Sequence, residues 1–113
     1  MLEKTNRVNM LFDFYAPLLK GRQRQFLELY YREDLTLSEI AELMDVSRQA
    51  VYDQLKRMEV VLEQFEDKLQ LLARHDQRKQ LINKLLSLIE VSDDWEPEHI
   101  RTVVKELATF ELE

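Results

Sequence analysis

Residues 37–58 constrain the fold of this chain more than any other stretch. Within them Ile40, Ala41 and Met44 follow an i, i+1, i+4 spacing, which places all three on one face of a helix. Ala41 is small at a point where a second helix would cross closely, and a larger side chain there would hold the two helices apart. The spacing therefore predicts the first helix of a closely crossing pair.

The second helix of the pair is predicted to begin after Ser47. Its hydroxyl can accept a hydrogen bond from a free backbone N–H of the first turn, and Val51 and Leu55 then supply an inner apolar face. Thr36 followed by Glu39 forms a capping box for the preceding helix. Together these features predict a helix-turn-helix, although any short α-hairpin with a small residue at its crossing has a similar spacing.

The outer face of the second helix carries the side chains that we expect to contact DNA. Arg48, Gln49 and Tyr52 fall where a recognition helix reads a major groove. Gln49 can pair with adenine, and Arg48 can contact guanine or phosphate. Lys56 and Arg57 follow about one turn later and are expected at phosphates. DNA is the predicted partner of this face.

The overall charge sets a limit on that prediction. The chain has 16 Lys and Arg against 22 Asp and Glu, a formal net charge of −6. Most DNA-binding domains of this size are basic, because phosphate neutralisation supplies much of their affinity. Asp53 lies one turn after Gln49 and would repel phosphate. Tight non-specific DNA binding is not expected, whereas specific but weaker DNA binding and binding to a protein both stay open.

Composition indicates an all-α protein. The 113 residues are 45% hydrophobic and 34% charged, and one Gly and two Pro are too few for a turn-rich β fold. We expect a single all-α domain over residues 1–113, with a helix-turn-helix core at 18–63 and C-terminal helices over 64–113. There is no cysteine, which fits a reducing cytoplasm. No apolar run is long enough to span a membrane, so a cytoplasmic protein without a membrane partner is predicted.

Two helices are expected before the helix-turn-helix. The first covers residues 4–15 and stops before Pro17, because a proline pushes the residue before it out of the α region. The second covers about residues 22–32. Arg22 and Arg24 lie at its N-terminal end, where the helix dipole does not favour cations. They are candidate contacts for DNA phosphates, and a solvated charged turn is the alternative.

Apolar residues continue from the second helix of the pair with steps of 4, 3, 4, 3, 4 and 3, which is a heptad seam of three repeats. The recognition helix is therefore expected to run on, or to be followed closely by another helix on the same seam. The seam can pack on the protein's own first and last helices or form a dimer interface. A homodimer is expected, since a helix-turn-helix usually reads two half-sites. The seam residues are Val51, Leu55, Met58, Leu62, Phe65, Leu69 and Leu72.

The pattern breaks at residues 74–79 and resumes with an apolar period over 81–89, which predicts a helix ending near Glu90. Residues 92–97 read as a loop. Pro97 suits the first turn of a last helix. The side chains expected to face inward on that helix are Ile100, Val103, Val104 and Leu107, with Phe110 as a terminal anchor.

No pattern in the sequence indicates an enzyme. His75 and His99 have no partners at metal-ligand spacing, and one glycine cannot build a phosphate-binding loop. Asp93 and Asp94 lack further oxygen ligands in register and read as a loop and helix cap. We expect no catalytic residues, no metal and no cofactor.

Two segments, residues 18–31 and 35–52, resemble region 4 of bacterial sigma factors, and this resemblance extends over about residues 18–63. The whole chain, from residues 5–15 to the C-terminal helix, is more specifically similar to the YlxM family. These are small bacterial proteins encoded beside the GTPase of the signal recognition particle. Asp45 stands at the turn position that is usually Gly, and Asp tolerates the left-handed conformation better than most residues.

The resemblance implies a three-helical bundle of the sigma region 4 type, unrelated to the winged helix, with a long C-terminal helical extension. It also implies a DNA-binding regulator with a role in the signal recognition particle pathway. The alternative is an accessory factor that binds the protein or RNA of the particle and does not bind DNA. An acidic helical protein can be steered by charge onto a basic partner, such as the particle's RNA-binding protein.

Overall fold

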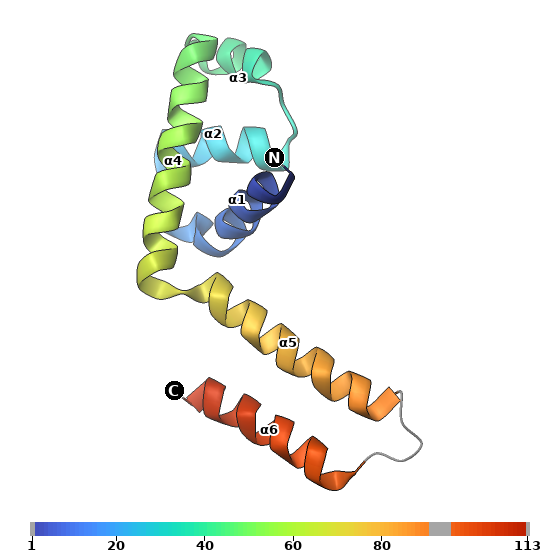
Figure 1. The fold of residues 1–113 in the computed structure, drawn as a ribbon. Helices are drawn as coiled ribbons and strands as arrows, with labels where there is room; N and C mark the ends of the chain where they lie inside the picture. Colours follow the sequence, from blue (N-terminus) through green and yellow to red (C-terminus); the bar gives the residue numbers. More distant parts are fainter. Residues whose placement is uncertain (1, 91–95, 113) are drawn as a thin grey trace. The chain divides into compact units, whose positions relative to one another are not determined.

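The computed structural model describes residues 2–90 and 96–112, with side chains over 6–90 and 96–110. The described residues are helical almost throughout and contain no strand, which confirms the predicted all-α helix-turn-helix bundle (Figure 1). The elements in chain order are α1 (Leu2–Tyr15), η1 (Ala16–Leu18), α2 (Gly21–Leu27), η2 (Glu28–Arg32), α3 (Leu37–Met44), α4 (Arg48–Leu69), α5 (Leu71–Glu90) and α6 (Pro97–Leu112).

The chain divides into two compact units, Met1–Leu72 and Ala73–Glu113, and each is described by itself. The first unit contains the helix-turn-helix, and the second consists of most of α5 together with α6. The single domain over residues 1–113, with a core at 18–63 and C-terminal helices at 64–113, stays a prediction.

The helix-turn-helix forms from the caps that the sequence predicts. The hydroxyl of Thr36 accepts from the N–H of Glu39 and the Glu39 carboxylate accepts from the N–H of Thr36, both at 3.1 Å. Asp45 ends α3 in the left-handed region at φ 56°, as expected for this turn. Ser47 then caps α4 by accepting from the N–H of Ala50 at 3.0 Å. Local hydrogen bonds thus fix the start of α3, the turn and the start of α4.

Helix α4 is the central packing element of the first unit. Helices α1, α2 and α3 all contact it, and Figure 1 shows them along one side of its length. Its inner residues are buried together with apolar residues of the other three helices, and the resulting core holds the helix-turn-helix in place. The core includes Val8, Leu11, Phe12, Phe26, Leu27, Ile40, Val51, Leu55, Met58 and Leu62.

The predicted heptad seam is only partly correct. Its first four residues, from Val51 to Leu62, are buried in the protein's own core, so packing on the first helix is the alternative that the structure shows for them. The next buried position on α4 is Glu66, and Leu69 is 48% exposed. A straight helix has 3.6 residues per turn and drifts away from a 3.5-residue repeat. Packing of the seam in the protein's own core therefore does not continue through Leu69.

Residues 47–73 form two helices in close succession, which is the second of the two arrangements expected from the sequence. Helix α4 ends at Leu69, and Gln70 takes the left-handed conformation at φ 55° before α5 begins. Leu72, the last residue of the predicted seam, is buried from the first turn of α5. The other predicted break, at residues 74–79, is wrong, because α5 runs without interruption from Leu71 to Glu90.

Figure 1 shows the turn between α4 and α5, and a hydrogen-bond network holds this turn in place. The hydroxyl of Tyr15, from the end of α1, donates to Oε1 of Glu66 at 2.5 Å and accepts from the N–H of Leu71 at 3.1 Å. The same Glu66 oxygen accepts from the N–H of Leu72 at 3.0 Å. The network satisfies two backbone donors at the start of α5, which otherwise have no partner within their own helix. Burial and the hydrogen bond to Glu66 raise the pKa of Tyr15.

The helix predicted over residues 22–32 begins at Gly21, whose φ of 62° suits glycine, and changes from an α-helix to a π-helix over Glu28–Arg32. The loop that follows includes Asp34, which also takes the left-handed conformation at φ 55°. A π-helix turns less per residue than an α-helix. Consecutive side chains of this segment therefore lie closer to one face than α-helical spacing predicts.

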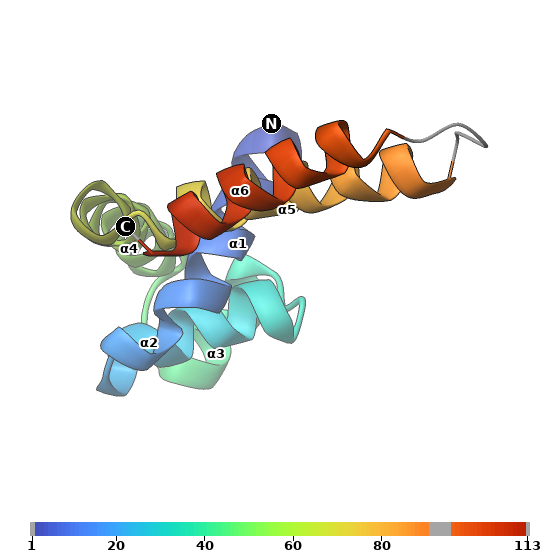
Figure 2. The same cartoon turned by 90° about the horizontal axis from the view of Figure 1, so that it is seen from below.

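The second unit is an antiparallel pair of helices. Figure 1 shows α5 and α6 side by side, Figure 2 shows α6 in front of α5, and contacts join the start of α5 to the end of α6. Arg74 donates to the carbonyl of Phe110 at 3.3 Å, and the guanidinium groups of Arg74 and Arg78 lie 5.3 and 5.9 Å from the centre of its ring. These contacts explain why polar residues at 74–79 stay helical, because long arginine side chains cover the aromatic ring.

Helix α6 begins at Pro97, as predicted. Val103 is buried, and Ile100, Leu107 and Phe110 are partly buried on the same face. Val104, also predicted to face inward, is 46% exposed, because it lies about 100° further round the helix than Val103. Asp93 and Asp94, and most of the loop predicted over residues 92–97, lie outside the described residues. Over residues 2–90 and 96–112, none of the helices has the length and apolar content needed to cross a membrane.

Replacing Tyr15 with phenylalanine should lower the free energy of unfolding by about 1–3 kcal/mol, since it leaves the partly buried N–H of Leu71 without its acceptor and removes a donor to the buried Glu66. Urea unfolding followed by circular dichroism measures the change. Tyr52→Phe is the matched control, because the Tyr52 side chain is 45% exposed and its loss of a hydroxyl should leave stability unchanged. Equal stability of Tyr15→Phe and wild type would contradict the role given to this network.

A second stability prediction concerns Arg7 of α1 and Glu63 of α4. The guanidinium donates twice to the carboxylate, at 2.6 and 2.9 Å, and this hydrogen bonding lowers the pKa of Glu63. A lowered pKa contributes stability above the pKa of the unfolded state, and the contribution disappears as pH falls through the folded pKa. Both side chains are about half exposed, so we expect only about 0.2–1 kcal/mol.

The test compares urea unfolding of the wild type and Arg7→Ala at about pH 7 and about pH 3. The difference in the free energy of unfolding should be present at the higher pH and vanish at the lower. Glu63→Gln is the matched control and should behave like Arg7→Ala. A difference of the same size at both pH values would contradict an electrostatic origin.

Candidate nucleic-acid interface

The first two turns of α4 place three of the predicted DNA contacts on the surface. Because Val51 and Leu55 face the core, Arg48, Gln49 and Tyr52 face outward and are exposed. Together they line an open hollow of about 520 Å³. The structure thus brings these three side chains together at the N-terminal end of α4, directly after the turn that joins it to α3.

Leu37 also lines this hollow, and the sequence reasoning missed it. It is the first residue of α3, directly after the Thr36 cap, and is only partly buried. Leu37 precedes Ile40, Ala41 and Met44 by three, four and seven residues, so the helical period of the inner face of α3 includes it and is the signal that could identify it. Leu37 gives the polar hollow an apolar wall.

Polar contacts along α4 already engage part of the predicted interface. The amide nitrogen of Gln49 donates to Oδ1 of Asp53 at 3.0 Å. The ammonium group of Lys56 lies 3.6 Å from a carboxylate oxygen of Glu59 and 5.5 Å from the centre of the Tyr52 ring. These groups are exposed enough to exchange partners, but each would give up an existing interaction to contact a ligand.

Arg48 and Arg57 are the less engaged cations of this face. Both are exposed, and within the described residues neither guanidinium has an ion-pair or hydrogen-bond partner. Arg57 follows Gln49 and Asp53 at four-residue steps, so it continues their stripe along the helix. The two arginines are therefore available to an anionic ligand at no cost in existing contacts.

Arg22 and Arg24 have structural partners and do not line the hollow. Arg22 donates to the backbone carbonyl of Met44 at 2.7 Å, where the last carbonyls of α3 have no partner within the helix. Arg24 donates to Glu28 at 2.9 Å within its own helical segment. Arg22 thus stabilises the C-terminal end of α3, which directly precedes the turn of the helix-turn-helix.

The exposed surface of α3 and of the turn that follows it is acidic. Glu39, Glu42 and Asp45, on α3 and in the turn, are all exposed. In a helix-turn-helix complex the first helix crosses the phosphate backbone, so carboxylates on α3 oppose close approach of DNA. The face is therefore suited to a small number of directed contacts rather than to broad phosphate neutralisation.

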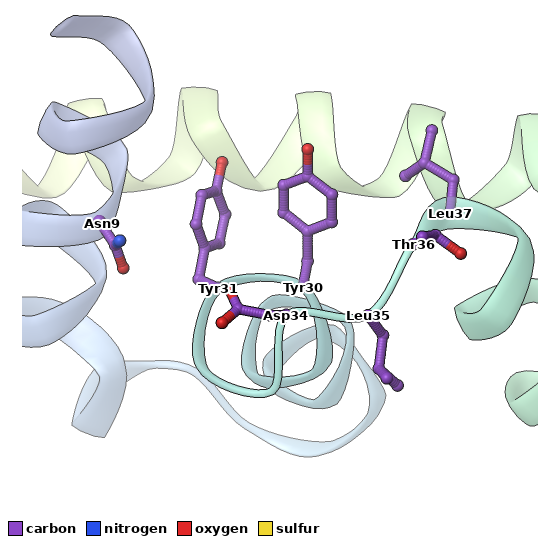
Figure 3. A pocket seen from close by; sticks show the side chains of 7 residues that line it. All are labelled: Asn9, Tyr30, Tyr31, Asp34, Leu35, Thr36 and Leu37. Atoms are coloured by element: carbon purple, nitrogen blue, oxygen red, sulfur yellow. The ribbon is translucent and has the colours of Figure 1, made fainter. Parts of the chain in front are cut away.

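A second hollow of about 460 Å³ lies where α1 and η2 meet the loop before α3 (Figure 3). Figure 3 shows Tyr30 and Tyr31 side by side, and their rings are edge to face with centres 4.9 Å apart. The hydroxyl of Tyr31 donates to Glu59 at 3.4 Å, and burial raises the pKa of Tyr31, so this phenol stays protonated. None of the predicted DNA contacts lines this hollow, but it shares Leu37 with the first one.

Residues 2–111 match the sequence profile of the UPF0122 family, described as "Putative helix-turn-helix protein, YlxM / p13 like". A UPF0122 protein of Bacillus thuringiensis (strain Al Hakam) and one of Bacillus cereus (strain 03BB102) are each 52% identical over 107 residues, which cover 95% of this chain and 93% of the relative. A UPF0122 protein of Bacillus mycoides (strain KBAB4) is 51% identical over the same lengths.

These matches confirm the resemblance that the helix-turn-helix residues and the flanking helices indicated. They extend over nearly the whole chain, including the two C-terminal helices, and so are not limited to the helix-turn-helix. The chain belongs to the UPF0122 family of YlxM / p13-like helix-turn-helix proteins.

Proposed function

We propose that this protein is a DNA-binding regulator without enzymatic activity, in which the N-terminal half of α4 enters a major groove. The observation that carries the proposal is the hollow at the start of α4, where Arg48, Gln49 and Tyr52 are exposed together. This is the end of a recognition helix that contacts base edges in helix-turn-helix complexes.

Each side chain has a role that follows from its chemistry and its present contacts. Arg48, with no partner to give up within the described residues, contacts guanine or a phosphate. Gln49 pairs with adenine after releasing Asp53. Tyr52 contacts a phosphate or stacks on the DNA, and Lys56 and Arg57 lie at phosphates further along α4.

Arg22 and Arg24 have a secondary role in the proposed interface. Arg22 holds the end of α3 through Met44, so its main contribution is to position the turn. Either arginine would have to loosen its bond to Met44 or Glu28 before it could reach a phosphate fully. Their loss should therefore affect DNA affinity less than the loss of Arg48.

The charge of the chain predicts how binding depends on salt. With a net charge of −6 and few free cations on α4, only a few phosphates can be neutralised. The slope of log affinity against log salt is about −0.9 per neutralised phosphate, so it should be shallow for this protein. Discrimination between sequences then depends mainly on Arg48 and Gln49.

Arg48→Ala should weaken binding to a selected duplex by about 5- to 150-fold, because a bidentate base contact contributes about 1–3 kcal/mol. Lys56→Ala should instead lower the salt slope by about 1 with little change in sequence preference. The measurement is fluorescence anisotropy with duplexes selected from pooled genomic fragments, at about 50 to 200 mM salt. The same titrations report both effects.

Asp53→Asn is the matched control, for which the expected change in DNA affinity has the opposite sign. It removes a carboxylate from the same face and leaves Gln49 an amide partner, so it should strengthen DNA binding. An unchanged affinity in Arg48→Ala, together with no gain in Asp53→Asn, would contradict the assignment of this face to DNA.

A second function is favoured by the net charge of −6: an accessory factor of the signal recognition particle that binds its protein or RNA component and does not bind DNA. The resemblance to the YlxM family implies the signal recognition particle as the partner. An acidic helical surface, with Glu39, Glu42 and Asp45 exposed on and beside α3, suits a basic protein partner. In both functions the protein would act in the cytoplasm.

Co-purification separates the two functions. If charge steers this protein onto the particle, the complex should form at about 50 mM salt and be lost at about 500 mM, where the Debye length is short. Replacing both Glu39 and Glu42 with glutamine should weaken it. Retention that does not depend on salt, or unchanged binding by the double variant, would contradict charge steering.

A further inference from the structure

The second unit has an apolar face that none of its own described residues covers. Ile82, Leu86 and Ile89 of α5 are 42%, 45% and 51% exposed, and Val104 of α6 is 46% exposed. On α5 the steps of 4 and 3 place the three residues in one line along the helix, the spacing at which helices pair in coiled coils. We call these four residues the hairpin face.

Helix geometry places all four residues on the same side of the α5–α6 pair. The contacts of Arg74 and Arg78 with Phe110 show which side of α5 faces α6, and Leu81, Leu85 and Leu88 continue that line. The residues of the hairpin face each follow an inward-facing residue by one position, or about 100°. Because the helices are antiparallel, a rotation of the same sign points to the same side of both (Figure 2).

The second unit has almost no core of its own. Among its described residues Val103 alone is fully buried. Two helices that face each other bury a single strip, which is too little apolar surface to stabilise a pair of this length in water. A second apolar face on the same hairpin therefore calls for a partner helix surface.

We propose that the hairpin face binds the hairpin face of a second copy of this chain, with the two α5 helices antiparallel about a two-fold axis near Leu86. Two hairpins joined in this way form a four-helix bundle. A two-fold interface uses the same surface on both copies, and a face of aliphatic side chains is complementary to itself. This inference goes beyond the proposed function and does not depend on DNA binding.

Charges at the ends of the face select a second copy in the antiparallel direction. Lys79 lies one turn before Ile82, and Glu90 directly follows Ile89. Both are exposed, and neither has an ion-pair partner within the described residues. Antiparallel pairing brings Lys79 of one copy within a helical turn of Glu90 of the other. A parallel pair would instead leave Lys79 of one copy and Glu90 of the other about 16 Å apart along the helices, too far for an ion pair.

Sedimentation velocity over about 1 to 100 µM protein tests the proposal, because a dimer has twice the 13.7 kDa mass of the chain. Leu86→Lys should raise the dimer dissociation constant at least about 100-fold, since each copy would bury a lysine in place of a leucine. Leu43→Lys is the matched control: Leu43 is a 64% exposed leucine on α3, outside the hairpin face, and its variant should stay dimeric.

Charge exchange tests the direction of pairing. Lys79→Glu and Glu90→Lys should each weaken the dimer several-fold, and the double variant should recover wild-type affinity, because the pairs are re-formed with their signs reversed. Circular dichroism and urea unfolding verify that each variant keeps its helices.

A monomeric wild type over the whole range, or a dimer that Leu86→Lys does not weaken, would overturn the proposal. The same holds if the charge-reversed double variant is weaker than both single variants. Arg48→Ala should remain dimeric, so a failure of DNA binding and a failure of this interface give different results.

Discussion

The apolar face of α4 is the interaction on which the first unit depends. Val51, Met58 and Leu62 are almost fully buried, and each contributes about 1.5–3 kcal/mol by leaving water. The same helix presents Arg48 and Tyr52 on its opposite side. Packing against α1, α2 and α3 thus fixes which side chains of α4 reach the surface. The position of the candidate interface is a direct consequence of the core.

The end of α4 depends on polar contacts instead. Glu66 occupies the position where an aliphatic residue would continue the core, and its carboxylate is buried against the hydroxyl of Tyr15 and a backbone N–H of α5. A buried carboxylate is costly unless it is hydrogen-bonded. The hydrogen bonds of the network therefore fix one geometry of the α4–α5 turn. A leucine in place of Glu66 would be buried but could not accept these hydrogen bonds.

The helix-turn-helix could be predicted from sequence because its signals are local. The Thr36–Glu39 capping box, the left-handed Asp45 and the Ser47 cap all appear in the structure where the residues placed them. The end of α4 could not be predicted in this way. Gln70 is not a residue type that marks a left-handed cap, and the residue after it, Leu71, donates its N–H to the hydroxyl of Tyr15, which lies 56 positions earlier in the chain.

In the candidate site too, some features follow from local sequence signals and others depend on tertiary contacts. Exposure of Arg48, Gln49 and Tyr52 follows from the helical period and was predictable. The Gln49–Asp53 and Arg22–Met44 hydrogen bonds depend on side-chain geometry that a pattern of residue types does not contain. Leu37 shares the helical period of the inner face of α3, but that period does not show that its side chain also lines the hollow, and Val104, which was predicted to face inward, is exposed on α6. Spacing thus identifies faces of helices, while the contacts made on those faces depend on the tertiary structure.

The central claim is that the first turns of α4 form the surface that binds DNA. The most direct test is amide hydrogen exchange, measured by NMR, with and without a selected duplex. The account predicts slower exchange at residues 48–57, with the amides of Val8 to Tyr15 on α1 unchanged. Slower exchange confined to other helices, or no change at residues 48–57 when the duplex is bound, would contradict it.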